Sequence, residues 1–201
     1  MNRIAVLAAA LSLAACGGGE DDAQASTTGD AASAAPAAAA PAATTTPAAP
    51  TVTDPQIAAI VVAANQVDID AGNLAKERAT DPRVKEFAQR MITDHSGVNQ
   101  AASDLVGKLG VTPEPNPTSQ QLTSDGEAKL AELQGQSGAA FDRAYIANEV
   151  AYHQAVLDAI DQTLIPSAQN GELKALLEQT RPAVQAHLDH ARQLQTSLGG
   201  A

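Results

Sequence analysis

Residues 54–201 carry apolar side chains at helical spacing almost throughout, and this periodicity restricts the fold more than any other feature of the sequence. Two apolar stripes follow Asp54-Pro55 and Asp81-Pro82. Aspartate followed by proline is typical of a helix start, because the carboxylate caps backbone N–H groups and proline fits the first turn. No segment shows the apolar-polar alternation of a half-buried strand. The sequence therefore predicts an all-α domain.

We expect four long helices and one shorter helix in this domain. The first two begin at the two Asp-Pro pairs, and Gly110 and the proline-rich stretch 113–117 end the second. The shorter helix covers about 118–134. The last two long helices cover about 137–164, where Pro166 ends the helix, and 170–198, where Pro182 is expected to kink or restart it. Four long helices with mostly short connections favour an antiparallel four-helix bundle with an extra helix between the second and third.

Polar residues interrupt the apolar stripes at the middle of each long helix. In an antiparallel bundle of equal helices, mid-helix positions meet at one level, so the sequence predicts one polar layer with a member from every helix. Glu149 precedes one of these residues by a turn, and Tyr145 by two turns; Asp94 and His190 lie close to the layer. The residues on the stripes are Asp68, His95, His153 and His187.

Three imidazoles and a carboxylate in a bundle core would suit one zinc, copper or iron ion. The candidate metal ligands are His95, His153, His187, Asp68 and Glu149. A second interpretation is a self-satisfied polar layer that fixes helix register, with His153 paired to Glu149 and His187 to Asp68. No Ser-His-Asp order, glycine-rich phosphate loop or Cys-His pair is present, so the sequence favours a non-catalytic role unless a metal supplies activity.

The first fifteen residues have the layout of a secretory signal, with Arg3, then an apolar core, then small residues before Cys16. The apolar core is shorter than the roughly 20 residues that a membrane-spanning helix needs. Leu13-Ala14-Ala15-Cys16 resembles a bacterial lipobox, which implies cleavage before Cys16 and acylation of it. Gly17 follows in place of the aspartate typical of inner-membrane retention, so we expect an anchor on the periplasmic face of the outer membrane.

Residues 16–53 are expected to form a lipidated, disordered tether. Of the 31 residues 23–53, 27 are Ala, Pro, Thr or Ser, and such a composition cannot bury enough apolar surface to fold. Without residues 1–15 the chain has 11 basic and 23 acidic residues. This charge argues against nucleic acid as a partner and leaves the lipid on Cys16 as the membrane contact.

Four segments of the domain resemble the bacterial family called domain of unknown function 4142, a ferritin-like group described as outer-membrane proteins. The resemblance implies a ferritin-like bundle and a cell-envelope location, but no established reaction. Ferritin-like di-iron sites use Glu-x-x-His pairs, and this sequence has none; Glu149-x-x-x-His153 is the nearest spacing. A mononuclear site is therefore the better expectation. The segments are 87–95, 137–146, His153 with Leu157, and 186–191.

Two functions remain open at this stage. One is an envelope-anchored lipoprotein whose bundle binds a single transition-metal ion. The other is a non-catalytic structural or protein-interaction module of the cell envelope with a self-satisfied polar core. The sequence names neither the metal nor a protein partner, and it leaves the oligomeric state undetermined.

Overall fold

The computed structural model describes residues 52–199, which are helical and contain no strand. The predicted signal peptide, Cys16 and most of the tether lie outside these residues. The helices are α1 (Asp54–Arg78), α2 (Pro82–Leu109), α3 (Pro117–Gln134), α4 (Gly138–Ala159), the π-helix η1 (Ile160–Leu164), α5 (Ile165–Ser167) and α6 (Gly171–Gly199). In the described part of the chain, no helix is both long and apolar enough to span a membrane.

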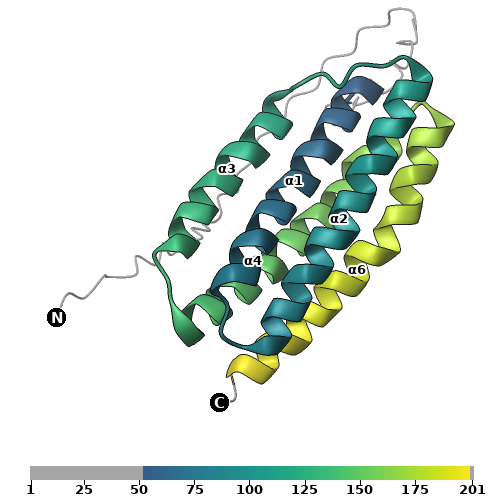
Figure 1. Cartoon of the computed structure of the whole chain (residues 1–201). Helices are drawn as coiled ribbons and strands as arrows, with labels where there is room; N and C mark the ends of the chain where they lie inside the picture. Colours follow the sequence, from purple (N-terminus) through teal and green to yellow (C-terminus); the bar gives the residue numbers. More distant parts are fainter. Residues whose placement is uncertain (1–51, 200–201) are drawn as a thin grey trace, which may run out of the picture. The chain divides into compact units, whose positions relative to one another are not determined.

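The four long helices form a bundle in which closely packed neighbours run in opposite directions. Helix α1 packs against α2 and α4, and α6 packs against the same two helices. Helix α3 lies along α1 on the outside of the bundle (Figure 1) and carries the chain back along its length, so α2 and α4 run in the same direction. One long crossover of this kind is the connectivity of ferritin-like bundles. The predicted all-α, ferritin-like bundle with an extra helix is confirmed.

The predicted helix starts are close to the observed ones, with one change of role. Asp81 caps α2 by accepting a 2.8 Å hydrogen bond from the Arg83 amide. Helix α1, however, is capped by Thr53 and not by Asp54. The Asp54 carboxylate instead accepts 2.9 Å hydrogen bonds from the amides of Gln169 and Asn170. Its side chain therefore ties the start of α1 to the loop before α6.

Two positions of the chain depend on glycine. Gly110 ends α2 in the left-handed conformation, at φ 64°, which favours glycine because it has no Cβ. Gly126 lies where α3 meets α1, and a Cβ there would come within 2.7 Å of Val67 Cγ2. The close approach of α3 to α1 therefore requires a residue without a Cβ at position 126.

Of the two prolines near the C-terminal helices, Pro166 does not act as expected. Pro166 does not end the third long helix, because α4 continues through η1 and α5 as far as Ser167. In η1 the Ile165 amide bonds to the Ile160 carbonyl, five residues back. Proline lacks the amide hydrogen that a regular helix interior needs, and the irregular π turn lies directly before it. Pro182 lies inside α6, which passes through it without restarting.

Candidate metal centre

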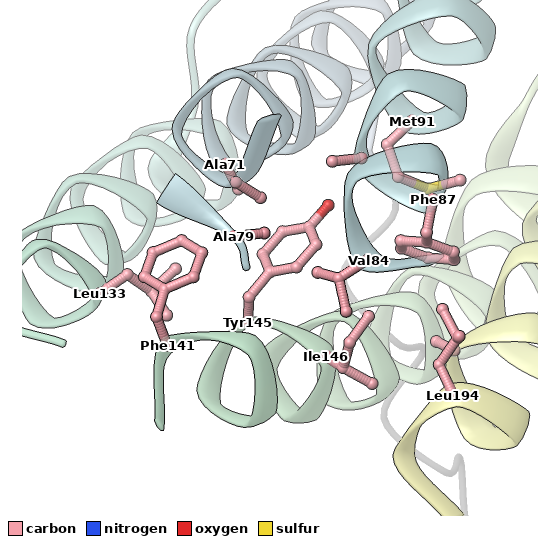
Figure 2. Close-up of a cluster of buried hydrophobic side chains, with 13 residues drawn as sticks. Ala71, Ala79, Val84, Phe87, Met91, Leu133, Phe141, Tyr145, Ile146 and Leu194 are labelled. Carbon is pink, nitrogen blue, oxygen red and sulfur yellow. The ribbon is translucent and has the colours of Figure 1, made fainter. Parts of the chain in front are cut away.

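A polar layer divides the core of the bundle into two apolar clusters. One cluster (Figure 2) surrounds the rings of Phe87, Phe141 and Tyr145. The other contains Ile57, Leu157 and their neighbours at the opposite end of the helices. On α1, α2 and α4 the layer lies between the segments that supply the two clusters, and on α6 it lies where these segments meet, with His187 next to Leu188. Buried polar side chains are therefore concentrated at one level, where they are surrounded by apolar packing.

The structure brings together all five residues that the sequence singles out as candidate ligands. Each is at least 94% buried, and each long helix contributes at least one of them. Helix α4 contributes two because its residues 149 and 153 are one turn apart on the same face. The five are Asp68 on α1, His95 on α2, Glu149 and His153 on α4, and His187 on α6.

The three imidazole rings form a nearly equilateral triangle. Their ring centres are 5.6 Å (His95–His153), 5.3 Å (His95–His187) and 5.4 Å (His153–His187) apart. Three imidazoles on one tetrahedral ion, with metal–nitrogen bonds of about 2.0–2.1 Å, would place their ring centres about 5 Å apart. One ligand atom of each ring lies within 4.8 Å of the others. Ligand atoms of Asp68, Glu149 and His153 also lie within 4.8 Å of one another. His153 therefore belongs to both of these groups of three candidate ligands.

One nitrogen of each ring is held by an oxygen atom outside the triangle. This leaves the second nitrogen of each ring without a hydrogen-bond partner among residues 52–199. Histidines that bind metals almost always engage their other nitrogen in this way, because that contact fixes the tautomer and the ring orientation. The three contacts are His95 Nδ1 with Asn65 Oδ1 at 2.7 Å, His153 Nδ1 with the Glu149 carbonyl at 3.0 Å, and His187 Nε2 with Asp94 Oδ2 at 2.9 Å.

The carboxylate of Asp68 faces these nitrogens without forming hydrogen bonds to them. Its Oδ2 lies 2.8 Å from His95 Nε2 and 3.3 Å from His153 Nε2, but neither contact has hydrogen-bond geometry. Both Asp68 oxygens and Glu149 Oε2 are buried and unpartnered within the described residues. Most buried polar side-chain atoms in proteins have a partner. A self-satisfied layer accounts for Asp68, His95 and His153 only through these two close contacts, and it leaves His187 Nδ1 without any partner within the described residues.

The two carboxyl groups differ in how readily they ionise. Burial works to raise the pKa of Asp68, but His95 and His153 outweigh it and the pKa falls to about 2. Burial, and then the charge of Asp68, raise the pKa of Glu149 well above 4.5. Asp68 is therefore ionised at neutral pH, and its charge favours the protonated form of Glu149. A cation would favour release of the Glu149 proton, because it replaces the repulsion from Asp68 with attraction.

Burial also keeps two of the histidines, His153 and His187, neutral. It lowers the pKa of His153 to about 4, against the opposing charge of Asp68. The pKa of His187 is lowered for the same reason, although Asp94 opposes the shift. A neutral imidazole offers a nitrogen lone pair to a metal, whereas a protonated one does not. These two rings are therefore in the ligand form at neutral pH.

These pKa shifts predict that the metal-free chain loses stability when acidified from pH 6.5 to 4.5. Unfolded histidines bind protons below about pH 6.5 but buried ones do not, so the stability present above that pH is lost as pH falls. His153 alone accounts for about 2 to 3 kcal/mol by pH 4.5. Glu149 acts in the opposite sense, because it keeps its proton when folded. Urea unfolding in EDTA at pH 7 and 4.5 should therefore show a larger acid-induced loss of unfolding free energy for Glu149→Gln than for the unsubstituted chain.

The matched control for this measurement is Glu127→Gln, which changes an exposed acid on α3. Because it leaves Glu149 in place, its acid-induced loss should equal that of the unsubstituted chain. Equal stability of Glu149→Gln at the two pH values would contradict the prediction.

Other side chains near the layer have different roles. Tyr145 is fully buried, and its hydroxyl has no partner within residues 52–199; burial, Glu149 and Asp68 raise its pKa well above 10. Asp70 is exposed and accepts a hydrogen bond from Gln66. His190 is half-buried and packs edge-on against the Phe87 ring at 5.2 Å. His190 belongs to neither group of candidate ligands.

Asp142, near the start of α4, ties that helix to the turn between α1 and α2. It is 2% exposed and accepts hydrogen bonds from the amide and hydroxyl of Thr80, at 2.9 and 2.6 Å, and from the Asp81 amide at 3.0 Å. Sequence reasoning also missed the contact between Asn65 and His95. Asn65 lies three residues before Asp68 and therefore on the same helix face. The pairing of His187 with Asp94, and not with Asp68, is a further difference.

Comparisons with known proteins agree with this fold. No curated protein sequence matches the chain. Among solved structures, a secreted protein of the DUF305 group from Streptomyces coelicolor has a TM-score of 0.60 with 11% sequence identity, covering 72% of this chain and 92% of its own. At this identity the similarity concerns the fold alone. The model of the family Domain of unknown function (DUF4142) matches residues 35–194, and the chain belongs to that family.

Proposed function

We propose that this domain binds one transition-metal ion in its polar layer, through the unpartnered nitrogens of His95, His153 and His187 and a carboxylate oxygen of Asp68. Glu149 is the second carboxylate within reach. The observation that carries the proposal is the hydrogen bonding of the rings, in which one nitrogen is fixed from outside and the other is left for a ligand. Zinc, copper and ferrous iron are the candidate ions, because imidazole suits all three.

The charges of the layer favour one divalent ion. Asp68 supplies one negative charge, and a second arises if Glu149 releases its proton. Both carboxylates are at least 99% buried, so the attraction between them and a cation is weakly screened. Three imidazoles with one or two carboxylates are ligands that hold a metal firmly. When bound, the ion would supply Lewis-acid or redox chemistry that the side chains lack.

Calorimetry on the full chain carrying Cys16→Ser tests the proposal without interference from the thiol. We expect one equivalent of zinc, copper or ferrous iron to bind, and Asp94→Asn to weaken binding about 10- to 100-fold, because outer partners of ligating histidines contribute that much. Asp189→Asn changes an exposed acid on α6 and should leave the affinity unchanged. Absence of binding for all three ions, or equal affinities of the two variants, would overturn the proposal.

We further propose that the ion is bound in the cell envelope, with the chain anchored through lipid on Cys16. The apolar segment before Cys16 and the small residues at the lipobox support this location. Labelling of cells with a radioactive fatty acid should mark the chain, and Cys16→Ala should remove the label and release the chain from membranes. Ser33→Ala in the tether should change neither result. A labelled, membrane-bound Cys16→Ala chain would contradict the anchor.

A further inference from the structure

A hollow of about 390 Å³ lies between α2 and α6, which run side by side (Figure 1). Helix α6 packs less extensively against α2 than against α4. Gly97 and Ala101 on α2 and Ala183 on α6 line the hollow, and all three are small and exposed. His95 and His187 line it as well. Exposed positions and two of the proposed metal ligands therefore border the same hollow.

His187 differs from the other two rings in the group that holds it from outside the triangle. The partners of the other rings are Asn65 and the Glu149 carbonyl, and both residues are at least 94% buried. His187 Nε2 instead contacts Asp94 Oδ2 at 2.9 Å, and the Asp94 side chain is 41% exposed. Asp94 is also part of the wall of the hollow. Water can therefore replace the contact that holds His187, but not those that hold the other two rings.

The His187 ring lies between the hollow and the polar layer. Its Nε2 contacts Asp94 on the wall of the hollow, and its Nδ1 is buried without a partner among residues 52–199. Arg90 Nε lies 3.5 Å from the same Asp94 oxygen, so this carboxylate keeps a cationic neighbour when the ring moves. Rotation of one side chain, with loss of one hydrogen bond, would connect the hollow with the layer.

We propose that the metal ion enters and leaves the polar layer through this hollow, with His187 as the ligand whose ring moves to admit it. This inference rests on the proposed metal site. The wall supplies the carboxylate of Asp94 and the hydroxyls of Thr93 and Thr180, which can replace part of the hydration of a cation. A second cavity, of about 340 Å³, also borders the layer, but most of its wall is apolar and it includes the cationic Lys129. Moving a charge along an apolar wall is costly, so the hollow is the favoured route.

Stopped-flow mixing tests the route, using the full chain carrying Cys16→Ser and whichever of zinc, copper or ferrous iron binds most tightly. Gly97→Leu narrows the hollow, and a Cβ at this position would meet no atom within 4 Å. We expect this variant to slow association and dissociation alike, by about tenfold, and to leave the dissociation constant unchanged. A steric block outside the ligands raises the same barrier in both directions. Ala183→Leu, which narrows the hollow from α6, should reproduce this effect.

Gly107→Leu is the matched control, because Gly107 is exposed on the same helix, has equal room for a Cβ and does not line the hollow. Ala155→Phe tests the second cavity, which Ala155 lines at an exposed position. Both variants should keep the rates of the unsubstituted chain. Unchanged rates in Gly97→Leu and Ala183→Leu, or slowing in Ala155→Phe alone, would overturn the route and leave the metal site intact. Absence of binding by all three ions would overturn both proposals.

Discussion

His153→Ala is expected to abolish the stabilisation that a bound metal gives the chain. An ion that binds only the folded state stabilises it by about 4 kcal/mol at a thousandfold excess over its dissociation constant. For a domain of this size, that corresponds to a rise of about 8 to 16 °C in the melting temperature. His153 should have the largest effect of any single ligand, because it belongs to both groups of converging side chains.

The measurement is a melting curve of the full chain carrying Cys16→Ser, with EDTA or with the tightest of the three candidate ions. His190→Ala is the matched control, since His190 lies in the same bundle but outside both groups. His190→Ala should keep the full metal-dependent rise in melting temperature. Comparison within each variant separates metal binding from any effect of the substitution on the metal-free fold. A full shift in His153→Ala would contradict its place as a ligand.

Asp142→Ala is expected to lower the free energy of unfolding by about 3 kcal/mol. The carboxylate joins the start of α4 to the turn between α1 and α2 through three hydrogen bonds from Thr80 and Asp81. Hydrogen bonds to charged groups contribute about 1.5–3 kcal/mol each, and they are not additive because all three share one side chain. The loss should appear in urea unfolding with or without metal.

Arg143→Ala is the control for this prediction, because Arg143 is the next residue and is exposed. Its substitution should change the free energy of unfolding by less than about 0.5 kcal/mol, as is usual for surface positions. Asp142→Asn keeps one acceptor oxygen, so its loss of unfolding free energy should lie between those of Asp142→Ala and Arg143→Ala. A loss below 1 kcal/mol in Asp142→Ala would mean that water replaces these hydrogen bonds.

The sequence was sufficient for the bundle because helix signals are local. Asp81 caps its helix through a residue two positions away, and the apolar stripes need only the 3.6-residue period. The convergence of His95, His153 and His187 could also be predicted, since mid-helix positions of equal helices share one level. Their role as metal ligands stays a prediction.

The features that sequence reasoning missed depend on contacts between distant segments. Asp142 is 61 and 62 residues from the groups that it binds, and nothing local distinguishes it from a surface acid. The effect of Pro166 depends on the π turn before it, which the apolar period does not predict. The fit of α3 against α1 depends on Gly126 meeting Val67, which lies on a distant segment of the chain.

The close approach at Gly126 also has a consequence for how the domain varies. Helix α3 connects the two halves of the bundle, yet its principal contact is with α1. The four long helices supply the polar layer without α3, so α3 is a cover on the outside of the bundle. A larger residue at 126 would displace this cover from Val67. Related bundles can therefore differ in how α3 lies against α1 and still share the same five buried polar residues.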